Sequence, residues 1–241
     1  MRGLDTLGPT PNAVKRTDLL AMLDFTLLDR NASEQDIRRL LGLADEHGVA
    51  AVCVFSEQAS LAREHASPQT RIAAVAGPFP EGAADLERYL LPIQQAIAGG
   101  AVEIDLVLEP GIGLEASMMV LNGVRMATEG LALKVIIETP ILDERAVRGA
   151  ARMALMAGAD FVKTCTGKRG GCSKVAARWV SEEIRRHEVT TGGRAGLKLS
   201  GGIRDLDGLN GLLDVVRSVD PGIIDQGRLR IGASSLIESL I

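Results

Sequence analysis

Segments with a helical hydrophobic period alternate with short apolar runs from one end of this sequence to the other. The apolar runs predict strands over residues 22–26, 50–55, 71–76, 103–108, 134–138, 161–164, 195–199 and 230–233. The amphipathic segments between them are long enough to cross from one parallel strand to the next. This pattern predicts βαβ units and a parallel sheet.

Eight strands are the number found in a closed (β/α)8 barrel, and the 241 residues are close to the roughly 250 typical of that fold. We therefore predict an α/β protein with a single TIM barrel over 22–241. An accessory segment, 1–21, precedes it, with a helix around 11–20. The alternative is an open doubly wound sheet, but the GxGxxG sequence usual after the first strand of a dinucleotide-binding sheet is missing.

Two of the predicted helices carry clear end signals. A helix over 33–47 opens with Ser-x-x-Asp, which is typical of a capping box. A second, over 143–157, stops at Gly158, because glycine adopts the left-handed conformation that ends many helices.

A glycine that ends a helix and leads into a strand recurs along the chain, at Gly48, Gly100 and Gly158. The fifth residues after these glycines are Cys53, Asp105 and Lys163. Side chains alternate between the two faces of a strand, and the intervening positions are nearly all apolar, as strands facing the helices require. We therefore expect these three side chains to point into the barrel at one height. The same count on the eighth strand reaches Gly232, which leaves room there.

The composition is that of an ordinary globular protein, with 46% hydrophobic and 24% charged residues. A formal net charge of −4 offers no general attraction for nucleic acid or an anionic membrane, so we expect neither as a partner. No apolar stretch is long enough to span a membrane, and residues 1–11 lack a signal-type hydrophobic region. We therefore expect a cytoplasmic enzyme.

Cysteine and histidine give no indication of a metal or a cofactor. The cysteines are odd in number and lack metal-ligand spacing: Cys53, Cys165 and Cys172. The histidines fall toward the ends of predicted helices, where the helix dipole favours a positive side chain: His47, His65 and His187. We expect no metal and no cofactor.

Lysine is rare in this chain, yet four of its six lysines lie in or just after predicted strands: Lys134, Lys163, Lys168 and Lys198. A buried lysine costs several kcal/mol unless it is paired or neutral, so one interpretation is a simple ion pair between Asp105 and Lys163. Arginine, however, cannot lose its proton, so lysines kept in strands indicate a need for a titratable amine. Lys198 is expected beside Lys163. Repulsion and burial would then bring the pKa of Lys163 from about 10.4 toward 7–8, a change of about 4 kcal/mol that makes it a nucleophile.

Two glycine- and serine-containing loops follow the last strands, over 199–202 and 232–235. Barrels often bind phosphate with the loops after strands seven and eight. One Gly-Gly pair is usually only a turn, but two such loops in these positions indicate a phosphate site.

Three segments of the sequence, 161–168, 196–204 and 232–235, closely resemble signature segments of the deoxyribose-phosphate aldolase family. Shorter supporting segments are 23–28, 52–54, 79–82, 103–107 and 133–139. Pro78 and Leu199 depart from the family pattern, and the loop over 169–172 is unusually basic and flexible. The chain also ends at Ile241, without the longer tail of some members.

The resemblance implies reversible cleavage of 2-deoxyribose 5-phosphate to acetaldehyde and glyceraldehyde 3-phosphate without a metal. It implies that Lys163 forms the Schiff base, that Lys198 lowers its pKa, and that Asp105 relays protons. Further matches to the family are the substrate-binding residues Asp24, Thr26, Cys53, Lys134 and Thr166. The matching phosphate-binding residues are Gly167, Gly201, Gly202, Gly232, Ser234 and Ser235.

Two other hypotheses stay open on the sequence alone. One is a class I aldolase of the same fold that acts on a different donor or on a non-phosphorylated aldehyde, with the loop over 169–172 as the place where the two would diverge. The other is a phosphosugar-binding barrel without catalysis, although the residues that catalysis needs are all present. In each case we expect small-molecule partners, and a homodimer is possible.

Overall fold

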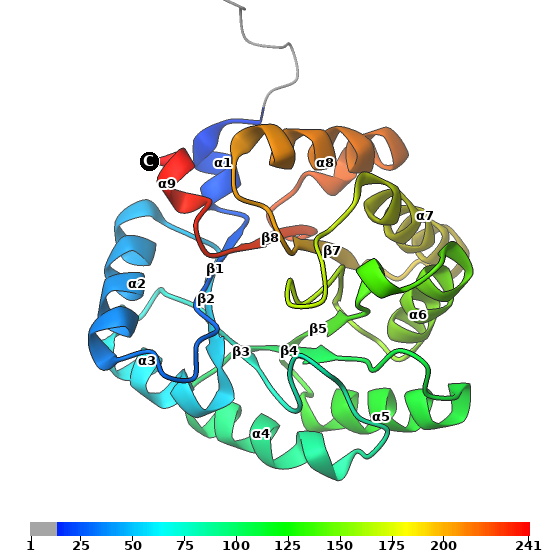
Figure 1. Ribbon diagram of the computed structural model, residues 1–241, viewed down its shortest axis with the longest axis horizontal. Helices are drawn as coiled ribbons and strands as arrows, with labels where there is room; N and C mark the ends of the chain where they lie inside the picture. Colours follow the sequence, from blue (N-terminus) through cyan, green and yellow to red (C-terminus); the bar gives the residue numbers. More distant parts are fainter. Residues whose placement is uncertain (1–13) are drawn as a thin grey trace, which may run out of the picture.

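The computed structural model describes residues 14–241, which form a closed barrel of eight parallel strands ringed by helices (Figure 1). Each strand pairs with the next along the chain, and the eighth pairs with the first. The strands are β1 (Leu23–Thr26), β2 (Ala51–Phe55), β3 (Ile72–Val75), β4 (Glu103–Val107), β5 (Ala132–Ile136), β6 (Phe161–Lys163), β7 (Gly196–Ser200) and β8 (Leu229–Ala233). The predicted TIM barrel is confirmed, and each strand ends within two residues of the expected position.

The helices follow the strands around the outside of the barrel (Figure 1). The α-helices are α1 (Arg16–Leu20), α2 (Glu34–His47), α3 (Ala59–His65), α4 (Glu87–Ala98), α5 (Leu114–Ala127), α6 (Glu144–Met156), α7 (Lys174–Thr191), α8 (Leu206–Val219) and α9 (Ile237–Leu240). Three short 3-10 turns are η1 (Ser56–Gln58), η2 (Thr139–Ile141) and η3 (Pro221–Ile223). Among residues 14–241 no helix is both long and apolar enough to cross a membrane.

Local signals explain where several helices begin and end. Ser33 and Asp36 form the capping box expected at the start of α2, and Gly48 ends that helix in the left-handed conformation at φ 63°. Asp143 caps α6 by accepting a hydrogen bond from the amide of Ala146. The accessory helix is shorter than the predicted 11–20, and the part of that prediction before residue 14 lies outside the described residues.

Two apolar clusters lie on opposite sides of the strands. The larger cluster fills the space between strands and helices and includes Val52, Ile104 and Val162. The smaller one lies inside the barrel on β2 and β3 and consists of Ala51, Cys53, Phe55, Ala73 and Val75, with Leu28 and Phe79 against it. Charged side chains occupy much of the remaining barrel interior.

Candidate active site

A cavity of about 390 Å³ opens at the carboxyl ends of the strands, where barrels of this kind place their active sites. Its walls come from the loops after β1, β6, β7 and β8. The lining residues are Thr26, Leu27, Leu28, Asp29, Lys163, Thr166, Gly167, Lys168, Ser200, Gly201, Gly202, Ile203, Arg204, Gly232, Ala233, Ser234 and Ser235. Of the charged residues inside the barrel, Lys163 is the one that reaches this cavity.

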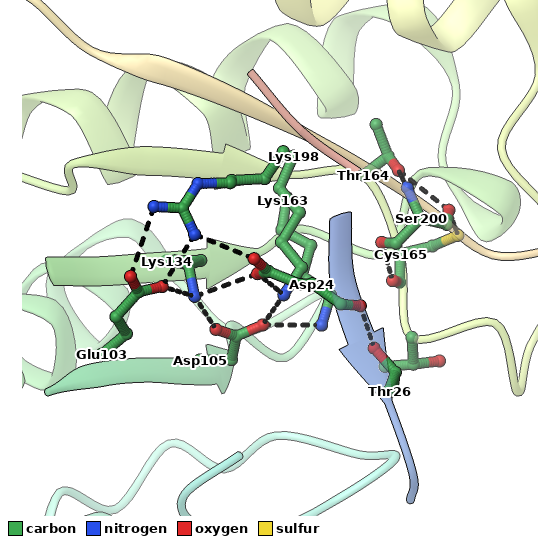
Figure 2. A network of polar contacts seen from close by, with 12 residues as sticks. Asp24, Thr26, Glu103, Asp105, Lys134, Lys163, Thr164, Cys165, Lys198 and Ser200 are labelled. Atoms are coloured by element: carbon green, nitrogen blue, oxygen red, sulfur yellow. Dashed lines mark hydrogen bonds and ion pairs between the residues drawn. The ribbon is translucent and has the colours of Figure 1, made fainter. Parts of the chain in front are cut away.

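Asp105 lies at the centre of a buried ionic cluster that Figure 2 shows from close by. Its Oδ2 accepts hydrogen bonds from the Nζ atoms of Lys163 at 2.8 Å and Lys198 at 2.7 Å. Its Oδ1 accepts one from the Nζ of Lys134 at 2.9 Å. Register explains the meeting, because Asp105 pairs with Lys134 across β4 and β5, and Lys163 pairs with Lys198 across β6 and β7.

Deeper in the barrel, two more carboxylates continue the cluster (Figure 2). Asp24 contacts Lys198 at 2.5 Å and Lys134 at 3.2 Å, while Glu103 contacts Lys134 at 2.5 Å. Arg230 reaches both carboxylates, at 2.9 Å from Asp24 and 3.2 Å from Glu103. All of these side chains are buried, so each charge depends on its partners rather than on water.

The three lysines differ in how many carboxylates hold them. Within residues 14–241, Lys134 contacts three carboxylates and Lys198 contacts two, whereas Lys163 contacts Asp105 alone. Lys163 is also the one whose side chain retains some exposure, at 4%, against 0% for the other two. The lysine that faces the cavity is therefore the one least tied to negative charge.

Electrostatics keeps the carboxylate of Asp105 and the ammonium group of Lys198 ionised. Burial alone would raise the pKa of Asp105, but the ammonium groups of Lys134, Lys163 and Lys198 outweigh it and hold the pKa well below its usual range. Burial alone would lower the pKa of Lys198, but the carboxylates of Asp105 and Asp24 outweigh it and raise the pKa. Lys198 thus stays an ammonium group that shares Asp105 with Lys163.

The loop after β6 is fastened to the end of β7 (Figure 2). Thr164 Oγ1 donates to Ser200 O at 3.0 Å, and Ser200 Oγ donates to Cys165 O at 2.6 Å. Gly201 follows with φ 94°, and a Cβ there would collide with the sulfur of Cys165, so only glycine fits this approach of the two loops. These contacts bring the loop after β6, with Gly167, and the loop after β7, with Gly201 and Gly202, to the same wall of the cavity.

The structure brings together the three predicted catalytic residues, Lys163, Lys198 and Asp105, within hydrogen-bond distance. The residues predicted to bind phosphate all line the cavity: Gly167, Gly201, Gly202, Gly232, Ser234 and Ser235. The predicted substrate residues fall into two groups. Thr26 and Thr166 line the cavity, whereas Asp24, Cys53 and Lys134 are fully buried in the barrel and do not line it. Burial raises the pKa of the Cys53 thiol.

Two cationic residues of the cavity wall, Lys168 and Arg204, were not among the predicted site residues. Within residues 14–241 neither has a carboxylate within 4 Å, so their charges are available to an anionic ligand. The available signal was their position, since Lys168 follows Gly167 and Arg204 comes two residues after Gly202. Among the described residues no three His, Cys, Asp or Glu side chains gather as a metal-binding group.

A lysine amine at the cavity, hydrogen-bonded to a buried carboxylate that a second lysine shares, is the site of a lysine-dependent enzyme of carbonyl chemistry. Comparison with known proteins agrees, because the profile of the DeoC/LacD family aldolases matches residues 19–236. The chain belongs to this family of aldolases.

Individual relatives cover nearly the whole chain. The deoxyribose-phosphate aldolase of Halalkalibacterium halodurans is 38% identical over 222 residues, which are 89% of this chain and 91% of the relative. That of Mycobacterium marinum is 38% identical over 206 residues, 80% of this chain and 86% of the relative. Among solved structures, the tetrameric deoxyribose phosphate aldolase from Aeropyrum pernix superposes with a TM-score of 0.75 at 29% identity, covering 94% of this chain and 91% of that one.

Proposed function

We propose that the protein cleaves 2-deoxyribose 5-phosphate reversibly to acetaldehyde and glyceraldehyde 3-phosphate through a Schiff base on Lys163. The observation that carries the proposal is the Lys163 amine, which lies 2.8 Å from Asp105 Oδ2 at a cavity that glycine, serine and cationic side chains also line. The relatives named for this activity support the choice of substrate.

Charge balance in the barrel favours Lys163 as the nucleophile. The interior cluster contains three carboxylates and four cationic side chains, namely Asp24, Glu103, Asp105, Lys134, Lys163, Lys198 and Arg230. Among the described residues the buried cations therefore outnumber the buried carboxylates by one, and the exposed Arg71 adds positive charge 2.7 Å from Glu103, so the release of a proton from one lysine reduces the excess positive charge. Lys163 gives up one carboxylate contact by this release, fewer than the other two lysines. The neutral amine is the form that attacks a carbonyl.

The steps follow from the positions of the amine and the carboxylate. The Lys163 nitrogen bonds to C1 of the open-chain sugar, and the carbinolamine loses water to give a protonated Schiff base. The C3 hydroxyl then gives up its proton, the C2–C3 bond breaks, and its electron pair moves toward the iminium to form an enamine. Glyceraldehyde 3-phosphate departs. C2 takes up a proton, and water releases acetaldehyde and the free amine.

Asp105 carries the protons of these steps in the proposed mechanism. Its Oδ2 lies between Lys163 and Lys198, so a proton taken near the reacting nitrogen can pass to the shared carboxylate and return. Lys198 holds positive charge beside the carboxylate throughout. The same charge stabilises the electron-rich oxygen that develops in the carbinolamine steps.

The 5-phosphate is assigned to the wall formed by the loops after β6, β7 and β8. Backbone amides and the hydroxyls of Ser234 and Ser235 offer hydrogen-bond donors there, and Lys168 and Arg204 offer positive charge. These groups favour a phosphorylated substrate over a neutral sugar.

Steady-state turnover of 2-deoxyribose 5-phosphate and of unphosphorylated 2-deoxyribose tests this function. We expect kcat/KM to be at least about 100-fold higher for the phosphate ester, because two or more charge-assisted contacts depend on it. Lys163→Ala should abolish turnover, and Lys174→Ala, which removes an exposed lysine at the start of α7, should not change it. Equal use of both sugars would favour the aldolase of another substrate, and equal activity of wild type and Lys163→Ala would refute the Schiff base.

A further inference from the structure

Glu138 is a buried carboxylate at the mouth of the barrel that the proposed mechanism does not use. It lies two residues after the end of β5 and has 0% exposure. Among residues 14–241 it is the one non-glycine residue with a positive φ, at φ 52° and ψ 52°. The sequence predicted a strand through this position, but the left-handed conformation ends β5 before it.

The segment around Glu138 is hydrogen-bonded to the chain at and just after Lys163. The amide of Ile137 donates to Lys163 O at 3.1 Å, and the amide of Thr139 donates to Thr164 O at 2.9 Å. Between these two bonds the Glu138 side chain reaches further along the same chain, where its Oε1 accepts from the amide of Thr166 at 3.3 Å.

A second hydrogen bond extends this contact into the cavity wall. Thr166 Oγ1 accepts from the amide of Lys168 at 3.0 Å. Thr166, Gly167 and Lys168 all line the cavity, whereas Glu138 does not. Glu138 is therefore connected through Thr166 to the wall assigned to phosphate, although it does not line the cavity itself.

Both the backbone and the side chain of Glu138 are costly for folding. The left-handed conformation is unfavourable for a residue with a Cβ and is usually taken by glycine or asparagine. Within the described residues Oε2 is buried without a hydrogen-bond partner, and burial raises the pKa of this carboxyl. Glycine at this position would avoid both costs, so stability alone does not explain a glutamate.

We propose that Glu138 is a positioning residue that orders the segment Thr166, Gly167 and Lys168 for binding the phosphate group of the substrate. The proposal rests on the proposed function for the identity of the ligand, but the ordering itself concerns any phosphate-like anion at this wall. Without the carboxylate, the Thr166 amide loses its acceptor and the segment Thr166, Gly167 and Lys168 becomes less ordered. More conformational entropy is then lost when the anion binds, and the affinity falls.

Glu138→Gly is the decisive variant, because it removes the carboxylate and relieves the left-handed backbone at once. We expect KM for 2-deoxyribose 5-phosphate and the Kd for inorganic phosphate, measured by calorimetry, to rise about ten-fold, as for one lost charge-assisted hydrogen bond. We expect kcat to change less than about three-fold and the thermal unfolding midpoint to stay the same or rise. Glu138→Gln keeps an oxygen that can accept from Thr166 and should remain within about three-fold of wild type in both constants.

Two further variants keep the result independent of folding. Thr139→Val changes the next residue, whose buried hydroxyl has no partner among the described residues, and it should bind phosphate like wild type. Thr166→Val removes the acceptor for the Lys168 amide from the other end of the contact and should weaken phosphate binding in the same direction as Glu138→Gly.

Phosphate binding separates this inference from the proposed function. Weaker phosphate binding by Glu138→Gly, in a protein that fails to cleave 2-deoxyribose 5-phosphate, would support the positioning role and refute the substrate. Wild-type affinity for phosphate in Glu138→Gly, or no phosphate binding by the wild type at tens of millimolar, would overturn the positioning role. A fall in kcat with KM unchanged would overturn it too, because it would place Glu138 in the chemical steps.

Discussion

Replacing Asp105 with asparagine removes the carboxylate that three lysines share and so tests the ionic cluster at its centre. The change keeps the shape of the side chain, but the ammonium groups of Lys134, Lys163 and Lys198 would then surround a neutral amide at distances now 2.7 to 2.9 Å. Breaking a buried ion pair by removing one partner costs about 3–5 kcal/mol of unfolding free energy. The lower end, about 3 kcal/mol, applies here because a lysine can release its proton.

The catalytic loss should exceed what destabilisation explains. General acid–base catalysis contributes about 10²–10⁴-fold, so we expect kcat of Asp105→Asn to fall by at least about 100-fold under conditions where the variant is fully folded. Urea unfolding followed by circular dichroism gives the stability, and acetaldehyde release from 2-deoxyribose 5-phosphate gives the rate.

Asp24→Asn provides a matched control within the same cluster. Asp24 is also fully buried and also contacts three cationic groups, Lys134, Lys198 and Arg230, but it does not touch Lys163. We expect a similar loss of stability, but the loss of kcat should be smaller than that of Asp105→Asn by a factor of about ten or more, because among the described residues Asp105 is the carboxylate that contacts the reacting amine. Asp105→Asn with kcat within ten-fold of wild type, or with no larger loss than Asp24→Asn, would refute the proton-relay role.

Three further predictions concern acid stability, the cavity rim and the thiols. Folding lowers the pKa values of Asp24, Glu103 and Asp105 from ordinary values of 3.8 for the aspartates and 4.5 for the glutamate. Their contribution to stability is therefore fully present above about pH 4.5 and is lost as the pH falls further. Urea titrations that show constant stability down to about pH 3 would contradict this. Arg169 in the loop after β6 lies 3.4 Å from Glu109 in the loop after β4, and the pair is partly exposed. Arg169→Ala should therefore raise KM only about two- to five-fold, and by less in high salt. An unchanged KM would show that this pair does not order the rim of the cavity. Burial of Cys165 raises its pKa to about 12, and partial burial of Cys172 raises its pKa to about 11, so at pH 8 roughly 10⁻³ or less of either is thiolate. Iodoacetamide should therefore label both more slowly in the folded protein than in urea, and Cys165 more slowly than Cys172; equal labelling rates of Cys165 in the folded and the urea-unfolded protein would contradict its burial.

The barrel and the centre of the site could be predicted from local patterns. Alternating hydrophobic periods repeat along the whole chain, so a few misplaced boundaries do not change the architecture. The count from the helix-ending glycines placed Asp105 and Lys163 on the inner face because strand periodicity is a short-range property, and the two side chains do meet.

What depends on contacts across the barrel could not be predicted in this way. The sequence indicated that Lys163 and Lys198 would repel each other, but the structure places Asp105 between them, with one oxygen accepting from both. The sequence also predicted a strand through Glu138, whose left-handed conformation accompanies contacts with the loop that follows the neighbouring strand β6. Lys168 and Arg204 were missed because adjacent charges in a loop do not reveal which of them face a cavity.

The central claim is that the Lys163 amine condenses with the aldehyde, and reductive trapping tests it most directly. Borohydride added to the protein with acetaldehyde reduces a Schiff base to a stable secondary amine, and peptide mass mapping then locates the added two-carbon group. The account predicts this group on Lys163 in the wild type and no trapped lysine in Lys163→Ala. Trapping on Lys198 or Lys134 instead, or no trapping in an active protein, would contradict it.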